Sequence, residues 1–270
     1  MLSEDEVREA ATALFEAEKT RAWAPPVSDR YEGADVADAY RIAIAVRDLK
    51  VKDGRTVRGH KIGLTSKAMR DMIGATEPDY GFLFDDWFIP EGSTIEMSRL
   101  HQPLVEAEVA FVMAEGLSGP SVNAADVIRA TNFVLPMLEI VDSRVSAIGK
   151  NSLVDSISDG AFCGFVVLGG NPAKLTDVDV RTVSASLSIN GEIRQTGSAR
   201  AVMGNPINSV AWLANKLHEL GVSIQAGDVI MSGSFIRAEF LKPGDTVLAL
   251  FDELGEVSVS IGAAQESHAG

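Results

Sequence analysis

Two stretches near the N-terminus repeat apolar residues at helical intervals. In the first, Ser3 and Glu6 have the spacing of a capping box, and the apolar positions that follow are Val7, Ala10, Ala11 and Leu14. The second stretch covers about 35–52 and runs into Asp53 and Gly54, a typical helix stop. The segment between them, AWAPPVSDRYEG, is expected to be a linker. The pattern therefore predicts a helical N-terminal segment over residues 1–56.

From about residue 57 the pattern changes to short apolar runs separated by glycine, proline and aspartate, which is typical of strands. The runs are FVLPMLEIV, AFCGFVVLGG, VSASLSI, DVIMSGSF, DTVLALF and EVSVSI. Asn190 and Gly191 are the pair that a two-residue hairpin turn prefers, because both positions need positive φ. One helix interrupts the strands, with Asn205 as its cap and Gly221 after its end. We expect a mainly β domain over residues 57–264 and a flexible tail over 265–270.

Composition narrows the class of protein. The chain has 270 residues, 46% of them hydrophobic, which is enough for one sizeable domain with a buried core. Its net charge of −14 argues against nucleic acid and anionic membranes as partners. Cys163 is the only cysteine, so a reducing compartment is favoured. The N-terminus has no apolar signal core and no apolar run reaches the ~18 residues of a spanning helix. These features predict a cytoplasmic location.

Three glutamates stand in apolar runs and are the first candidates for chemistry. In VEAEVAFV, residues 105–112, strand alternation places Glu106 and Glu108 on one face. Glu139 lies in a second apolar run, where Pro136 suggests a sheet edge or a bend. If the two strands are neighbours, the three carboxylates form an all-oxygen site, which favours magnesium or manganese over zinc. The alternative is that one face of each strand is exposed and the acids are surface residues.

Three further side chains are candidates, each with a plainer alternative. Lys61 lies in GHKIGLTSKAM between apolar residues and glycines, where burial would lower its pKa toward an acid-base range. From sequence alone, a surface lysine at a strand end is the favoured interpretation. His60 beside it fits a packing residue. Asp79 lies in the turn-rich segment EPDYGFLFDDWF, which could present its side chain to a cleft. The alternative is an ordinary turn aspartate. Ser158, in SISDGAF, also fits a simple turn.

The common hydrolase and nucleotide-binding motifs G-x-S-x-G, G-x-x-x-x-G-K-[ST] and G-x-G-x-x-G do not occur. Instead, GHKIGLTSKAM, EPDYGFLFDD, PLVEAEVAFV, LEIVDSR, SISD and NSVAWLANKL occur in this order over about residues 35–262. Together they resemble the 2-oxohept-3-enedioate and 2-hydroxypenta-2,4-dienoate hydratases, which belong with the 4-oxalocrotonate decarboxylases in the fumarylacetoacetate hydrolase-like superfamily. The resemblance implies an α+β fold, a mixed β-roll of the fumarylacetoacetate hydrolase C-terminal-domain type with an N-terminal helical part.

The resemblance also implies roles for particular residues. The metal ligands fall on Glu106, Glu108 and Glu139, and the cofactor would be Mg²⁺ or Mn²⁺. The acid-base residues fall on Lys61 and Asp79, and the substrate-binding residues on Ser158 and Leu83. GHKIGLTS is closer to the hydratases than to the decarboxylases, where a leucine takes the place of His60. Gly160 is a departure, because relatives usually have asparagine after the aspartate at 159.

The function that the resemblance implies is a hydro-lyase that adds water to a small-molecule 2-hydroxy-2,4-dienoate or 2-oxo-3-enedioate. The product would be a 4-hydroxy-2-oxo acid of aromatic meta-cleavage catabolism. The alternatives are a 2-oxo-3-enedioate decarboxylase, a carbon-carbon bond hydrolase of the superfamily and a noncatalytic assembly partner. A second substrate carboxylate would need a cation such as Arg70, Arg144 or Arg237. The resemblance further implies a homo-oligomer, a pentamer or decamer.

Overall fold

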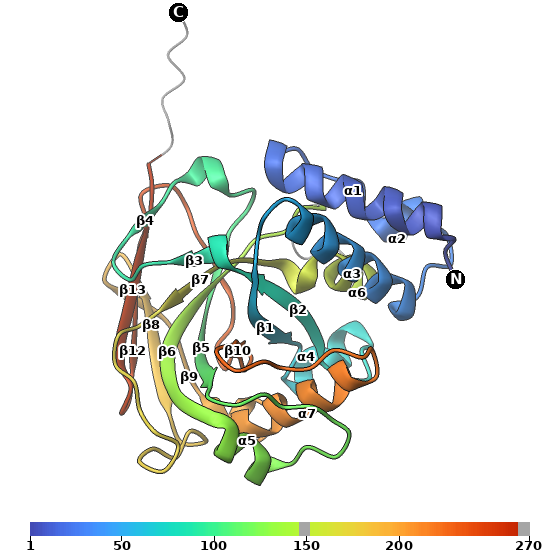
Figure 1. Cartoon of the computed structure of the whole chain (residues 1–270). Coiled ribbons are helices and arrows are strands. Elements are labelled where there is room, and N and C mark those ends of the chain that lie inside the picture. The colour runs from blue at the N-terminus through green and yellow to red at the C-terminus, as the bar shows by residue number, and fades with distance from the viewer. Residues whose placement is uncertain (146–151, 264–270) are drawn as a thin grey trace, which may run out of the picture.

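The computed structural model describes residues 1–145 and 152–263. The tail predicted over 265–270 lies outside these residues. The N-terminal helices are α1 (Glu4–Thr20), α2 (Val27–Arg30) and α3 (Val36–Lys52), and they form a layer on one side of the molecule (Figure 1). The capping box of Ser3 and Glu6 is present, and Asp35 caps α3, so both predicted helices are confirmed. The linker prediction is wrong in part, because α2 forms one helical turn inside it.

The helices α1 and α3 pack together through the apolar stripe that the sequence predicted. Val7, Ala10, Ala11 and Leu14 of α1 are buried in one small core with Ile42 of α3. This core is separate from the larger one beneath the sheets. The helical layer therefore has an apolar interior of its own.

The larger sheet carries most of the candidate residues. Its strands are β1 (Val57–Gly63), β2 (Asp79–Phe84), β3 (Phe88–Ile89), β5 (Leu104–Met113), β6 (Thr131–Val141), β7 (Cys163–Leu168), β10 (Val229–Met231) and β11 (Glu239–Phe240). Their order is β2-β1-β10-β5-β6-β7-β3, and β11 pairs with β5. Parallel pairs such as β1 with β10 occur beside antiparallel pairs such as β5 with β6, so the sheet is mixed.

Pro136 does not mark a sheet edge, because β6 lies between β5 and β7. The strand is visibly curved in Figure 1, which agrees with the alternative of a bend. Pro136 pairs with Val109 in register, and its carbonyl accepts a hydrogen bond from the backbone N–H of Gly169. A proline is tolerated here because its carbonyl still joins the ladder although it has no N–H to donate.

The smaller sheet packs against the larger one. Its strands are β4 (Thr94–Ile95), β8 (Ser184–Ile189), β9 (Glu192–Ser198), β12 (Thr246–Phe251) and β13 (Gly255–Ile261), in the order β4-β13-β12-β8-β9. The predicted hairpin joins β8 to β9, and Asn190 and Gly191 have φ of 55° and 80° as its turn requires. β13 contacts β6 and β7, so the two sheets share the main apolar core.

Short helices fill the connections. They are α4 (Lys67–Ile73), α5 (Ala124–Ala130), α6 (Leu153–Ser158) and α7 (Pro206–His218), with 3₁₀ turns η1 (Asp85–Trp87), η2 (Met97–Arg99), η3 (Gly160–Phe162) and η4 (Ala199–Ala201). Only α7 was predicted, and its Asn205 cap is confirmed. No helix within residues 1–145 and 152–263 has the length and apolar character to cross a membrane.

Candidate active site

The three glutamates lie together on one face of neighbouring strands. Glu106 of β5 stands directly opposite Glu139 of β6, and Glu108 is two residues further along the same face of β5. Each can place a carboxylate oxygen within 4.8 Å of the others. Glu108 and Glu139 are buried, with 1% and 0% exposure, and Glu106 is partly buried. The surface-residue alternative is therefore wrong.

Burial dominates the electrostatics of this group, and repulsion among the carboxylates adds to it. Burial, and after it the charge of Glu139, raises the pKa of Glu106 to about 7. Burial, and after it the charges of Glu139 and Glu106, raises the pKa of Glu108 well above its ordinary value. The backbone N–H of Gly233, which donates to Glu108 Oε2 at 2.8 Å, acts in the opposite direction. The charged forms of these two carboxylates are therefore disfavoured here, and a bound cation would favour them.

Lys61 of β1 reaches into the same group. Its Nζ lies 2.5 Å from Oε1 of Glu139 and donates to the carbonyl of Ala161 at 2.8 Å. Burial alone would lower the pKa of Lys61, but the attraction of Glu139 outweighs it and raises the pKa above its ordinary value. The alternative of a surface lysine is wrong, because Lys61 is 4% exposed. His60 next to it faces away and packs near Phe82, as the packing interpretation expects.

Asp79 is the first residue of β2 and is buried, so the interpretation as an ordinary turn aspartate is wrong. In the β1–β2 ladder it stands opposite Gly63, two residues along the same face from Gly81, which pairs with Lys61. A Cβ atom on Gly63 would lie 2.2 Å from Oδ1 of Asp79, so only glycine leaves room for this carboxylate. Burial raises the pKa of Asp79, against the attraction of Lys61 and a hydrogen bond from Ser156 Oγ at 3.2 Å.

Ser158 and Leu83 complete the predicted set. Ser158 is the last residue of α6, so the simple-turn alternative is wrong, and its buried Oγ has no hydrogen-bond partner in the described part of the chain. Leu83 of β2 is fully buried on the same strand face as Asp79. η3 follows α6 and approaches β2 so closely that a Cβ on Gly81 would lie 2.2 Å from the carbonyl oxygen of Gly160. This contact brings the Ala161 carbonyl to Lys61.

Several contributors were missed at the sequence level. Ser156 holds Asp79, Gly233 holds Glu108, and Gly63 and Gly81 allow close approach. The glycines flanking Lys61 and Asp79 were a usable signal, because a glycine inside a strand often marks the close approach of another group. Ser156 gave no signal, since a serine on a short helix is ordinary.

The three arginines proposed for a second substrate carboxylate differ in their surroundings. Arg144 is buried and already bound, with Nε 2.7 Å from Oδ1 of Asp159 and further bonds to the carbonyls of Asp142 and Cys163. Arg70 donates to the carbonyls of Leu64 and Thr65. Arg237 is exposed. The Arg144 side chain is thus bound to Asp159, the residue that follows Ser158 at the C-terminal end of α6.

Comparison with known proteins agrees with this architecture. The family model for fumarylacetoacetate (FAA) hydrolase C-terminal matches residues 51–261. The chain is 42% identical to a 2-oxo-hept-4-ene-1,7-dioate hydratase of Escherichia coli, covering 92% of this chain and 95% of the relative. It is 38% identical to a 2-keto-4-pentenoate hydratase of Paraburkholderia xenovorans, covering 92% of each.

Among solved structures, a 4-oxalocrotonate decarboxylase from Pseudomonas putida G7, complexed with magnesium and adipate, superposes with a TM-score of 0.94. It is 35% identical, and the match covers 97% of this chain and 99% of that chain. The chain belongs to the fumarylacetoacetate hydrolase family. The predicted superfamily and its mixed α+β roll are therefore confirmed.

Proposed function

We propose that this protein is a divalent-metal-dependent hydratase that adds water to a 2-hydroxy-2,4-dienoate or 2-oxo-3-enedioate. The observation that carries the proposal is the group of three glutamates beside a buried lysine and a buried aspartate. The 42% identity to a relative named as a 2-oxo-hept-4-ene-1,7-dioate hydratase supports the reaction class. In this assignment the product is a 4-hydroxy-2-oxo acid of aromatic meta-cleavage catabolism.

The carboxylates fit a divalent cation. Oε2 of Glu139 is buried without a hydrogen-bond partner among the described residues. Burial, and after it the repulsion of neighbouring glutamates, raises the pKa of Glu106 and of Glu108 although Lys61 lies close by. Glu106, Glu108 and Glu139 would hold the ion, and an all-oxygen ligand set favours Mg²⁺ or Mn²⁺. When bound, the ion supplies positive charge that attracts the carboxylate and the C2 oxygen of a 2-oxo acid.

The chain's own residues handle the protons. In our assignment Lys61 exchanges a proton with the carbon chain of the substrate, since its Nζ lies at the edge of the glutamate group. Asp79 keeps one oxygen, Oδ1, unbonded within the described residues, while Ser156 fixes the other. A carboxyl group whose pKa burial raises is suited to orient a water molecule and take up its proton. Ser158 Oγ, also unbonded, is assigned to the substrate.

A decarboxylase of 2-oxo-3-enedioates is the second candidate. One specific observation favours it, the TM-score of 0.94 to a 4-oxalocrotonate decarboxylase. His60 favours the hydratase, because the resemblance places a leucine there in decarboxylases. The two reactions use the same charge stabilisation and differ in whether carbon dioxide leaves.

One assay separates the two candidates. The purified protein with Mg²⁺ or Mn²⁺ is given one 2-hydroxy-2,4-dienoate and one 2-oxo-3-enedioate, and loss of ultraviolet absorbance is followed while carbon dioxide is measured. A hydratase removes absorbance without releasing carbon dioxide. Release of one carbon dioxide for each enedioate consumed identifies the decarboxylase, and no turnover of either substrate contradicts both assignments.

A further inference from the structure

A charged cavity of about 160 Å³ lies between the C-terminal end of α1, η2 and β7, away from the glutamate group. Phe165 on its wall pairs with Ile140, whereas Glu139 pairs with the next residue, Val166. Because neighbouring residues of a strand point to opposite faces, Phe165 and Glu139 face opposite sides of the sheet. The cavity is therefore distinct from the candidate active site.

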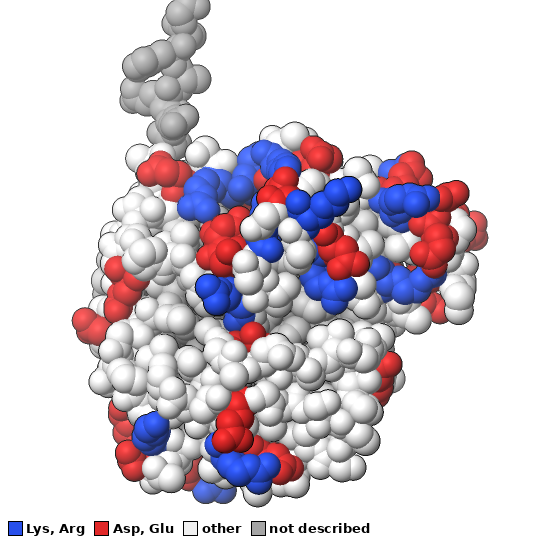
Figure 2. Space-filling model, viewed as in Figure 1, with Lys and Arg blue, Asp and Glu red and all other residues white. Residues whose placement is uncertain are grey.

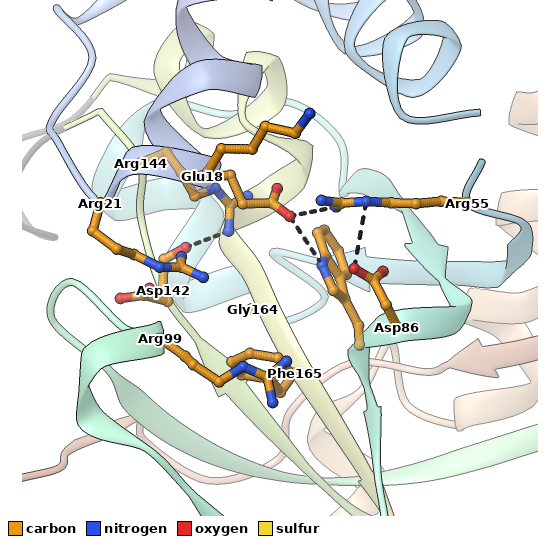
Figure 3. A pocket seen from close by; sticks show the side chains of 11 residues that line it. Glu18, Arg21, Arg55, Asp86, Arg99, Asp142, Arg144, Gly164 and Phe165 are labelled. Atoms are coloured by element: carbon orange, nitrogen blue, oxygen red, sulfur yellow. Dashed lines mark hydrogen bonds and ion pairs between the residues drawn. The ribbon is translucent and has the colours of Figure 1, made fainter. Parts of the chain in front are cut away.

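Cations outnumber acids around this cavity. Its lining has five cationic and three acidic side chains: Lys19, Arg21, Arg55, Arg99 and Arg144 against Glu18, Asp86 and Asp142. Figure 3 shows Arg21, Arg55, Arg99 and Arg144 around one space, reaching in from different elements. Figure 2 shows Lys and Arg gathered with Asp and Glu over the helical part of the molecule, although the chain as a whole carries −14.

The acidic residues of the cavity each have ion-pair or hydrogen-bond partners within the protein. Glu18 binds Lys50 and Arg55, each at 2.5 Å, and Asp86 lies 3.4 Å from Arg55. The carboxylate of Asp142 accepts hydrogen bonds from the backbone N–H groups of His101 and Gln102. These partners neutralise Arg55, and Asp159 neutralises Arg144. Lys19 pairs with Asp53. Two cations, Arg21 and Arg99, then remain against one carboxylate, that of Asp142, so the surplus is positive.

Arg21 and Arg99 carry this surplus. Neither guanidinium group has a hydrogen bond or ion pair within residues 1–145 and 152–263. Arg99 lies with its Cζ 4.4 Å from the centroid of the Phe165 ring. Stacking on a ring face leaves the N–H groups at the guanidinium edge free to bind an oxyanion through two parallel bonds.

The backbone of Arg21 supports a role for its side chain. Arg21 ends α1 in the left-handed conformation, with φ 61° and ψ 17°, where its N–H bonds to the carbonyl of Ala17. Glycine is the usual residue at such a position, because a side chain there costs conformational energy. Figure 3 shows the Arg21 side chain turned toward the cavity beside Asp142. An arginine kept in a strained position and aimed into a cavity is typical of a binding residue.

We propose that this cavity is a binding site for a small oxyanion, a phosphate or carboxylate compound, held by Arg21 and Arg99 over the ring of Phe165. Its volume equals about five water molecules at ~30 Å³ each, which suits an anion of a few heavy atoms. The site is separate from the glutamate group, so it does not depend on the proposed hydratase activity.

The test is calorimetric titration of the whole protein with inorganic phosphate and, separately, succinate, in chloride-poor buffer with EDTA. One ion is expected to bind per chain, and Arg21→Ala and Arg99→Ala are each expected to weaken binding at least about tenfold, the loss of one charge-assisted pair. Stronger binding of phosphate or of succinate identifies which oxyanion the site takes. The matched control is Arg194→Ala, which removes an exposed arginine on β9 and is expected to leave binding unchanged.

A second arm separates this site from the glutamate group. Glu106→Gln is expected to leave anion binding intact. No saturable binding of either probe contradicts the proposal. Equal binding by the wild type and the Arg21→Ala/Arg99→Ala double variant also contradicts it. A repeat titration with Mg²⁺ and no EDTA gives the last contradicting outcome, which is binding that appears only with Mg²⁺ and disappears in Glu106→Gln. Circular dichroism of each variant shows whether a loss of binding comes from unfolding instead.

Discussion

Lys61 is a side chain whose chemistry is set by its neighbours. Sequence indicated the residue because apolar residues and glycines surround it, but it could not reveal that Glu139 and the Ala161 carbonyl bind its Nζ. These partners lie 78 and 100 residues away in the chain. The direction of its pKa shift depended on them, since burial and the attraction of the glutamate act oppositely.

We expect Lys61→Met to lower turnover of the dienoate by about 10²- to 10⁴-fold, the usual loss when a general acid-base group is removed. The methionine keeps a similar volume but cannot exchange a proton. Affinity for Mg²⁺ and for a substrate analogue should change much less, because the glutamates remain. Steady-state kinetics and metal titration measure the two effects separately.

Lys67→Met is the control for Lys61→Met, because Lys67 is exposed on α4 and pairs with the exposed Asp71. Its turnover should match that of the wild type. Near wild-type turnover by Lys61→Met, or a loss explained entirely by weaker metal binding, would show that Lys61 is structural. Asp79 would then be the leading proton-transfer residue.

The glutamates are expected to respond differently to loss of charge. Glu106→Gln removes one of three repelling carboxylates, so the metal-free protein should be at least as stable as the wild type, while Mg²⁺ or Mn²⁺ affinity falls by more than about 10- to 100-fold. Glu139→Gln should weaken metal binding similarly but destabilise the metal-free protein, because Lys61 loses its partner. Calorimetry with each metal and thermal unfolding in EDTA measure both quantities.

Glu115→Gln, an exposed change just after β5, is the control for both variants and should alter neither quantity. Full activity of Glu106→Gln or Glu139→Gln in chelated buffer would rule out the metal assignment. Equal stability of the two metal-free variants would show that the Lys61–Glu139 ion pair contributes little.

At the scale of elements, the patterns that repeat over many residues were predictable and the brief ones were not. The 17-residue helices α1 and α3 and the capped helix α7 were recognised from their stripes, and the β8–β9 hairpin from its turn pair. α6 has six residues, too few to show a period, so a simple turn remained an open interpretation for Ser158. Pro136 left a sheet edge and a bend both open, because sequence does not show which strands flank β6.

A buried ion cluster joins the helical layer to the sheets. Glu18 of α1 binds Lys50 of α3 and also Arg55, and Trp87 Nε1 donates to it at 3.4 Å. Burial alone would raise the pKa of Glu18, but attraction from Lys50, Arg144 and Arg55 holds it well below its ordinary 4.5. Helical spacing alone could not predict this cluster, because its members come from three separate segments.

Glu18→Gln should lower the free energy of unfolding by about 3–5 kcal/mol at pH 7, because Lys50 stays buried without its charge partner. A carboxyl whose folded-state pKa is depressed stabilises the protein above its unfolded-state pKa and stops doing so as pH falls through the folded value. The difference between wild type and variant should therefore be full at pH 7 and 5 and narrow below about pH 4.5. Urea unfolding at stepped pH measures it.

Two further variants sharpen the Glu18 test. Glu16→Gln changes an exposed glutamate of the same helix and should alter stability by less than about 0.5 kcal/mol. Glu18→Leu combined with Lys50→Met replaces the pair by apolar side chains and should recover much of the loss. A difference between Glu18→Gln and wild type that stays constant from pH 7 to 3.5 would show that shape, and not charge, explains the effect.

At the scale of the whole molecule, the smaller sheet offers a surface for self-association. β9 is an edge strand of that sheet, and Ile193 on it is 68% exposed. Leu250 of the neighbouring ladder is 48% exposed. An edge strand with exposed apolar side chains tends to pair or to be covered. We expect a homo-oligomer larger than a dimer, in line with the pentamer or decamer that the family resemblance implies.

Light scattering after size-exclusion chromatography at micromolar concentration measures the oligomer directly, and the mass should exceed twice that of the 28.7 kDa chain. The double variant Ile193→Lys/Leu250→Lys should have a lower mass, because an interface over these positions would have to bury two unpaired charges, which is unfavourable. The control is Ile128→Lys, an exposed apolar residue on α5, away from this sheet. A monomeric wild type would contradict the prediction, and an unchanged mass in the double variant would place the interface on another face.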